Sequence, residues 1–267
     1  DVIMPDGRTL QVASVHHYRD QWSRAFDVTY EDTSGEQQYV HQTTYGMSER
    51  LLGAIVASHG DNRGLIMPPA VAPVQVIVIP ILSKEGSEEV MSKAEEIVSS
   101  LKSSGIRTKL DSRDIRPGQK YYDWEIKGVP LRIEIGPRDL ANNSVMCAKR
   151  TGEKTSQSLD GLVDIVQNQL ESIGDEMMSN SLQHFNSHIQ KLPNFTVDGN
   201  NLIFDEPIQT DIVYEFAFAG NDAEAEMIEK STGLSFLGDS TKLYDEKKPC
   251  VFTSALTNRR IYLSKGY

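Results

Sequence analysis

Apolar residues recur along this chain in two patterns, and these predict its helices and strands. Between Ser48 and Gly60 they follow at three- and four-residue spacing, which predicts a short helix that Ser48 can cap and Gly60 can end. Residues 74–81 instead form a run rich in β-branched residues, typical of a strand covered on both faces. Strand-like and helical segments then alternate to residue 148, and this alternation predicts a small α/β domain.

The remaining elements are predicted from the same periodicity and from turn residues. Strands are expected at 9–15, 28–31, 38–44, 65–67, 106–110, 129–135, 144–148, 212–218, 251–252 and 261–263. Helices are expected at 18–26, 87–105, 121–127, 159–191 and 223–231. An antiparallel sheet backed by helices is therefore predicted for the first 73 residues, and a small α+β domain for residues 194–267.

Composition indicates a soluble globular protein. The 267 residues are 39% hydrophobic and 24% charged, and they contain no run of eighteen apolar residues that could cross a membrane. The chain opens at Asp1 without the charged-then-apolar pattern of an export signal. Its two cysteines, Cys147 and Cys250, lie far apart in the sequence and make no disulfide framework. We therefore expect a reducing, cytoplasmic location.

The distribution of charge along the chain bears on whether the protein binds nucleic acid. A net charge of −11 argues at first sight against nucleic acid, because phosphate binding needs a basic surface. Residues 105–154, however, hold eleven Lys and Arg against seven Asp and Glu. This distribution suits a protein that contacts RNA through one domain, although scattered surface lysines would give similar counts.

Arg50 is the first candidate for chemistry. It falls in the first turn of the helix that follows Ser48, where the helix dipole disfavours a cation by a few tenths of a kcal/mol, roughly. A bound anion would reverse this preference, because a guanidinium beside free helix N–H groups can clamp a phosphate. A surface arginine with no such role is the alternative.

Several motifs around Arg50 resemble motif 3 of the class II aminoacyl-tRNA synthetases. These are G-x-S-x-R at 46–50, His59-Gly60-Asp61, Gly64-Leu65, Pro68-Pro69 and Ala72-Pro73. Within that class the chain looks most like the prolyl-tRNA synthetases of the archaeal and eukaryotic type. The stretch WEIKGVPLRIEIGPRDL at 124–140 and the terminal Tyr267 support the same family.

The resemblance implies an ATP site and an amino-acid site in the first 73 residues. By carry-over from the family, ATP is bound by Gln11, Ser14 and Arg50, with Arg50 as the catalytic residue that grips the triphosphate. The amino-acid site would be lined by His16, Thr44, Tyr45, Gly46 and Ser48. Tyr45 departs from the family's tryptophan, and Ser14 from its threonine. Polar residues that simply face water on a half-buried strand are the alternative for Gln11 and Ser14.

The resemblance also implies an anticodon-binding domain within the locally basic region. Cations at the ends of strands would contact tRNA there, since sheets of this kind bind ligands at strand ends. The candidates are Arg113, Arg116, Lys120, Arg138 and Arg150, for each of which a solvated surface position is the alternative.

The predicted architecture is α/β and α+β multidomain, in four segments. Residues 1–73 would be the C-terminal part of an antiparallel-sheet class II catalytic core, 74–158 the α/β anticodon-binding domain, 159–193 a long connecting helix and 194–267 a small α+β C-terminal domain. Archaeal-type relatives commonly hold a four-cysteine zinc site in this last region. Here Cys250 matches one ligand, but Thr253, Ala219 and Glu224 stand at or near the other positions. We therefore expect no structural zinc and no other metal site.

The implied activity is proline–tRNA ligation through a prolyl-adenylate, by an enzyme whose N-terminal catalytic portion lies outside this chain. ATP with Mg²⁺, L-proline and tRNA(Pro) would be its ligands, with no membrane partner, and the class implies a homodimer. Two alternatives stay open. One is a class II synthetase of neighbouring specificity, threonyl or histidyl, and the other is a non-catalytic RNA-binding paralogue.

Overall fold

The computed structural model describes residues 1–82, 86–242 and 244–267, which form two compact units. Unit 1 comprises Asp1–Ala54 together with Phe185–Tyr267, and unit 2 comprises Ile55–His184. Helix α2 (Arg50–His59) and helix α6 (Leu162–His188) are continuous across the boundaries between them. In the described ranges, no helix is both long and apolar enough to cross a membrane.

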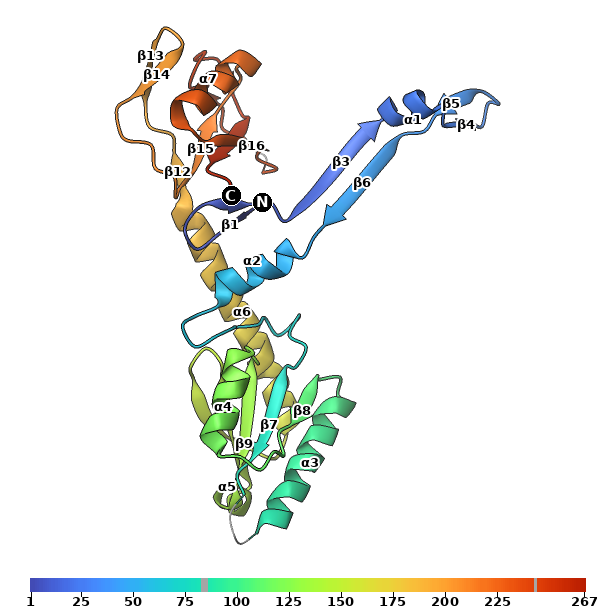
Figure 1. Ribbon diagram of the computed structural model, residues 1–267, viewed down its shortest axis with the longest axis vertical. Helices are drawn as coiled ribbons and strands as arrows, with labels where there is room; N and C mark the ends of the chain where they lie inside the picture. Colours follow the sequence, from blue (N-terminus) through green and yellow to red (C-terminus); the bar gives the residue numbers. More distant parts are fainter. Residues whose placement is uncertain (83–85, 243) are drawn as a thin grey trace. The chain divides into compact units, whose positions relative to one another are not determined.

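Unit 2 is built on a five-stranded mixed sheet with the order β11-β10-β9-β7-β8 (Figure 1). Its strands are β7 (Val76–Pro80), β8 (Thr108–Leu110), β9 (Leu131–Ile135), β10 (Ser144–Lys149) and β11 (Lys154–Ser158). Strands β8 and β9 pair with β7 in parallel, whereas β10 runs antiparallel to both β9 and β11. The helices are α3 (Ser87–Ser103), α4 (Pro117–Ile126), α5 (Pro137–Ala141) and most of α6.

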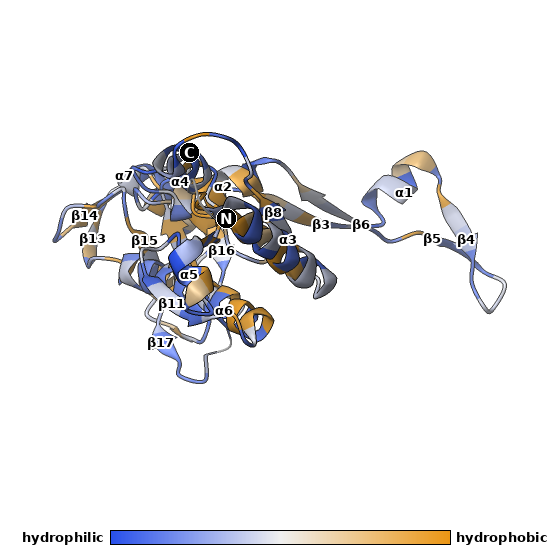
Figure 2. Cartoon of the chain, turned by 90° about the horizontal axis from the view of Figure 1, so that it is seen from below, coloured by the Kyte–Doolittle hydropathy of each residue, from blue (hydrophilic) through white to orange (hydrophobic). Residues whose placement is uncertain are grey.

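Both faces of this sheet are covered, as the β-branched run predicted. Val76 and Val78 pack with α3 and α6 in one core, and the alternate residues Ile77 and Ile79 pack with Tyr121 and Trp124 of α4 on the other face. Helix α3 carries hydrophilic and hydrophobic residues (Figure 2), as expected of a helix that buries one side only. The polar side chains of Arg132 and Glu134 on β9 and of Lys154 on β11 lie on the face that carries α4.

The C-terminal part of unit 1 is a four-stranded sheet with the order β12-β15-β19-β16. These strands are β12 (Ile189–Lys191), β15 (Val213–Ala217), β16 (Ser235–Asp239) and β19 (Arg260–Ser264). Helix α7 (Asp222–Thr232) begins with a capping box from Asn221 and Glu224 and ends at Gly233, which has a φ of +68°. The other elements are the hairpin of β13 (Phe195–Asp198) with β14 (Asn201–Phe204) and the short pair β17 (Lys248–Pro249) and β18 (Leu256–Thr257).

The N-terminal part of unit 1 is a long antiparallel ribbon of β3 (Ala13–Arg19) and β6 (Gln42–Met47) (Figure 1). Its far end carries α1 (Gln21–Phe26) and the pair β4 (Thr29–Glu31) and β5 (Gln37–Tyr39). Before the ribbon, β1 (Val2–Ile3) pairs with β2 (Thr9–Leu10). The Thr9 N–H donates to the Lys265 carbonyl (2.9 Å), so the two ends of the chain are joined within this unit.

The α/β and α+β multidomain prediction is confirmed, but some elements differ. Strand β3 continues through His16 to Arg19 because it pairs with β6, so α1 begins only at Gln21. Residues 65–67 are not a strand, although their N–H groups at 65 and 67 donate to the carbonyls of 126 and 128. Residues 251–252 lie in a turn. The first 73 residues form separate two-stranded pairs and not one sheet. The boundaries of the four segments stay a prediction.

Candidate functional site

The predicted ATP contacts line one pocket in unit 1. Gln11, Ser14 and Arg50 surround a hollow of about 220 Å³ together with Gly46 and Ser48. Arg50 is the first residue of α2, and its N–H donates to the Ser48 hydroxyl (3.3 Å), which caps the helix as predicted. A Cβ added to Gly46 would lie 3.3 Å from Ser14 Oγ, so the two positions are in close contact across the ribbon. Arg50 therefore meets Gln11 and Ser14 at this pocket, although it is far from both in the sequence.

The Arg50 side chain is exposed beside this pocket. Among the interactions of the described residues, its guanidinium makes no hydrogen bond or ion pair. The first turn of a helix leaves N–H groups without intrahelical partners and carries a partial positive charge. An uncompensated cation at this point favours an anion in the pocket.

The predicted amino-acid contacts lie on both faces of the β3–β6 ribbon. His16 is directly opposite Thr44, and Val15 is directly opposite Tyr45. Directly paired residues share a face, and successive residues alternate, so Tyr45 faces away from His16 and Thr44. Tyr45 is 76% exposed. The register thus separates Tyr45 from His16 and Thr44 on the ribbon, and its role in the amino-acid site stays a prediction.

A row of rings on the ribbon was not predicted. His16 stacks on Tyr18 (5.5 Å between ring centroids), Tyr18 meets Trp22 edge to face, and Trp22 stacks on Phe26. Tyr18 and Trp22 also line a shallow hollow with Thr44. The sequence showed Trp22 and Phe26 only as a pair at helical spacing, and the continuation of the row through β3 depends on the strand reaching Arg19.

Three of the predicted tRNA contacts lie at one edge of the sheet of unit 2. Arg113 and Arg116 follow β8, and Arg138 follows β9; because both strands run parallel to β7, their carboxyl ends meet at the same edge. Arg116 and Arg138 are exposed. Arg113 is half-exposed and forms ion pairs with Asp111 (2.7 Å) and Asp123 (2.8 Å).

Lys120 and Arg150 are buried, which corrects their prediction as tRNA contacts. The Lys120 ammonium donates to the Asp111 carbonyl (3.0 Å), and desolvation lowers its pKa. Arg150 follows the antiparallel strand β10 and therefore lies at the opposite edge of the sheet from Arg138. Its side chain is 1% exposed and binds both carboxylate oxygens of Asp61. Both residues are structural.

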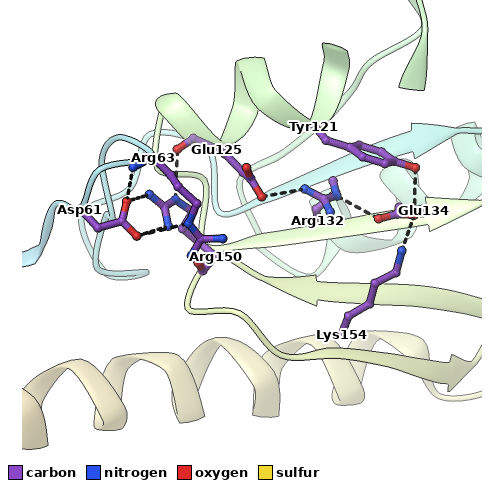
Figure 3. A network of polar contacts seen from close by, with 8 residues as sticks. All are labelled: Asp61, Arg63, Tyr121, Glu125, Arg132, Glu134, Arg150 and Lys154. Carbon is purple, nitrogen blue, oxygen red and sulfur yellow. Dashed lines mark hydrogen bonds and ion pairs between the residues drawn. The ribbon is translucent and has the colours of Figure 1, made fainter. Parts of the chain in front are cut away.

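A polar network on the α4 face of the sheet was also missed (Figure 3). Glu134 accepts hydrogen bonds from Arg132 Nε (3.0 Å), the Tyr121 hydroxyl (2.9 Å) and Lys154 Nζ (2.9 Å). Burial alone would raise the pKa of Glu134, but these three donors together lower it, so the carboxylate stays charged. Polar residues 132 and 134 within the apolar strand β9 were the available signal.

The residues near Cys250 do not fit a tetrahedral zinc site. Cys250 is buried, and its sulfur accepts a hydrogen bond from the Ala219 N–H (3.2 Å). Outside residues 83–85 and 243, no group of three or more His, Cys, Asp or Glu side chains could hold a metal ion. The buried Arg260 guanidinium instead donates to the carbonyls of Glu246 (3.0 Å) and Thr257 (3.1 Å). The Arg260 guanidinium thus joins the two ends of the loop formed by residues 246–257.

Comparisons with known proteins show the family of this chain. Residues 75–169 match the family described as an anticodon binding domain. The chain is 43% identical over 254 residues to the proline–tRNA ligase of Methanocorpusculum labreanum, which covers 94% of this chain and 52% of that protein. It is 41% identical over 254 residues to the proline–tRNA ligase of Thermococcus kodakarensis, covering 93% of this chain and 52% of that protein.

A solved structure shows the same fold. The structure of Giardia lamblia prolyl-tRNA synthetase in complex with prolyl-adenylate matches 100% of this chain and 58% of its own chain, with a TM-score of 0.86 and 26% identity. The fold described above is that of a class II aminoacyl-tRNA synthetase. Within that class, the chain belongs to the proline–tRNA ligase family. It spans about half the length of the curated relatives it matches.

Proposed function

We propose that the full-length protein carrying this chain ligates L-proline to tRNA(Pro). In the first step the proline carboxylate attacks the α-phosphorus of ATP, which gives prolyl-adenylate and releases pyrophosphate. In the second step a terminal ribose hydroxyl of the tRNA attacks the prolyl carbonyl and AMP leaves. The convergence of Gln11, Ser14 and Arg50 on one pocket is the observation that carries this proposal.

Each residue of this pocket has a distinct proposed role. The Arg50 guanidinium holds the triphosphate, and it stabilises the negative charge that moves onto the pyrophosphate as the bond to the α-phosphorus breaks. Gln11 hydrogen-bonds the adenosine part, and Ser14 lies beside it. His16, Thr44, Gly46 and Ser48 are proposed for the amino-acid side of the site. No protein nucleophile is needed, because the reaction depends on positioning and charge neutralisation.

We further propose that ATP is used with Mg²⁺. Mg²⁺ binds through substrate phosphates and keeps several waters, so it needs few protein ligands. In the described part of the chain, no three His, Cys, Asp or Glu side chains form a group that could hold a metal ion. A homodimer is proposed because it is usual for the class. A cytoplasmic location is proposed because the two cysteines are free and buried.

The α4 face of unit 2 is proposed to read the anticodon. Bases of a single-stranded loop are recognised by hydrogen bonds to their edges and by stacking, while cations contact phosphates. Arg132, Glu134 and the half-exposed Lys154 place donors and acceptors together on one face of the sheet, beside the Tyr121 ring. Arg116 and Arg138 are proposed phosphate contacts, because both are exposed at the adjoining edge.

An ATP–pyrophosphate exchange assay of the full-length protein with each amino acid tests this function. Exchange that depends on proline supports it, and dependence on threonine or histidine would show the neighbouring specificity. Tight tRNA binding without exchange would show a non-catalytic paralogue. Arg50→Ala should reduce exchange by about a hundredfold or more while tRNA affinity stays the same. Arg259→Ala, at an exposed arginine paired with Asp239, is the control. Normal exchange by Arg50→Ala would exclude the clamp.

A further inference from the structure

The segment that follows α2 is joined to the rest of unit 2 by an ion pair between Asp61 and the buried Arg150. Arg150 Nη1 donates to Asp61 Oδ2 (3.0 Å), and Nη2 donates to Asp61 Oδ1. This paired geometry is the strongest that a guanidinium and a carboxylate can form. Asp61 supplies the counter-charge for a guanidinium that is almost fully removed from water, and the contact holds the pKa of Asp61 well below its usual range.

The same guanidinium holds the C-terminal end of α4. Arg150 Nε donates to the Glu125 carbonyl (3.1 Å) in the last turn of that helix, and Nη2 also donates to the Gly64 carbonyl (3.3 Å). The last carbonyls of a helix lack intrahelical partners and carry a partial negative charge, so a cation is favourable there. Arg150 therefore fixes the backbone of Glu125.

The Glu125 side chain in turn lies on the α4 face, which is proposed to read the anticodon. Its carboxylate lies 3.7 Å from Arg132 Nη1, and Arg132 Nε donates to Glu134. Figure 3 shows Asp61, Arg150, Glu125, Arg132 and Glu134 in one continuous series across the unit. The backbone carbonyl of Glu125 thus contacts Arg150, and its side chain contacts Arg132 on the α4 face.

Backbone contacts hold the neighbouring residues in the same place. The Leu65 N–H donates to the Ile126 carbonyl (3.0 Å), and the Met67 N–H donates to the Gly128 carbonyl (3.1 Å). A Cβ on Gly128 would lie 2.7 Å from the Leu65 backbone, so only glycine permits this approach. The end of α4 is therefore held by the segment that carries Asp61.

We propose that Asp61 and Arg150 are positioning residues for anticodon recognition, which hold Glu125 against Arg132 at the RNA face. This inference rests on the proposed function of that face. Without the Asp61 charge, the buried guanidinium has no counter-ion, and it must turn toward water and release the Glu125 carbonyl. The end of α4 then loses its fixed position, and the Glu125 carboxylate no longer orients Arg132.

The test is aminoacylation by the full-length enzyme, with the KM for tRNA measured beside tRNA-independent ATP–pyrophosphate exchange. Asp61→Asn removes the charge but keeps the shape, and it should raise the KM for tRNA roughly tenfold with exchange unchanged. Asp61→Glu keeps the charge and should restore part of the loss. The control is Glu96→Gln, which removes one charge from an exposed pair with Lys93 on α3.

Arg132→Met distinguishes the positioning role of Asp61 and Arg150 from the proposed anticodon recognition by the α4 face, because it alters that face directly. If Arg132→Met raises the KM for tRNA and Asp61→Asn does not, the positioning role is wrong and the face stands. If neither changes the KM, the proposed face is also wrong. An equal loss of exchange and of tRNA use in Asp61→Asn would show general damage to the fold and overturn the positioning role. Should Asp61→Asn fail to fold, a normal KM for tRNA in Arg150→Lys, which keeps the charge but loses the fork, would overturn it.

Discussion

Replacing Asp111 by asparagine should destabilise unit 2, because this buried carboxylate joins the end of β8 to α4. Asp111 accepts hydrogen bonds from Arg113 Nη2 (2.7 Å) and Nε (2.9 Å) and from Trp124 Nε1 (2.8 Å). Its side chain is 1% exposed. Asparagine has the same shape but no charge, so the fork of Arg113 and the indole N–H lose their common acceptor.

The size of the effect follows from the pKa of this carboxyl. Hydrogen bonds from Arg113, and then from Trp124, outweigh burial and lower the pKa of Asp111 from 3.8 to about 2. At about 1.4 kcal/mol per pH unit, the folded state favours the charged carboxylate by about 2.5 kcal/mol. Because the pKa is lowered on folding, this stabilisation is complete above about pH 4 and is lost as the pH falls toward 2.

Urea unfolding followed by Trp124 fluorescence measures this difference. A Trp22→Phe background removes the tryptophan of unit 1, so the signal reports on unit 2. Asp111→Asn should lower the free energy of unfolding by about 2 kcal/mol at pH 7, and this difference from wild type should shrink between pH 4 and pH 2. Asp114→Asn, the same change at an exposed position in the same loop, is the control. Equal urea midpoints for Asp111→Asn and wild type at pH 7 would refute the reasoning.

Three further substitutions and the addition of zinc test backbone contacts, a loop and the C-terminal region. Gly64 has a φ of +130°, and a Cβ there would lie 2.5 Å from Ile126 Cα, so Gly64→Ala should cost roughly 3 kcal/mol by the same assay. Gly152→Ala, with a φ of +119° but open space, should cost only about 1 kcal/mol, and equal losses would contradict the steric argument. Arg260→Met should destabilise the C-terminal sheet by about 2 kcal/mol and speed proteolysis of residues 246–257, because two carbonyls lose their donor. Added zinc should leave the wild-type melting temperature unchanged, and a zinc-dependent rise would refute a site without metal.

Local patterns were sufficient for much of the fold. The β-branched run at 74–81, the periodic residues of α6 and the Ser48 cap of α2 each predicted the element that forms. These features depend on residues within a few positions of one another, whose spacing fixes which side can be buried. For the same reason the sequence placed Arg50 in a first turn, next to free N–H groups.

Long-range register and strand direction decided which candidate residues meet. Tyr45 and Thr44 are neighbours in the sequence, yet pairing with β3 places them on opposite faces of the ribbon. Arg138 and Arg150 both follow strands, but the antiparallel direction of β10 separates them onto opposite edges. Neither fact can be obtained from spacing, because a one-residue change of register or a reversed strand would leave the local pattern unaltered.

The sequence by itself determined the longer helices α2, α3, α6 and α7, the buried strand β7, the resemblance to the family and the residue types able to bind phosphate. Tertiary structure alone decided which of those cations are free. Arg150 and Lys120 lie in the same basic stretch as Arg116 and Arg138, but packing buries the first two and leaves the others in water. A buried guanidinium needs a carboxylate from elsewhere in the chain, and Asp61, 89 positions away, is brought to Arg150 only by folding.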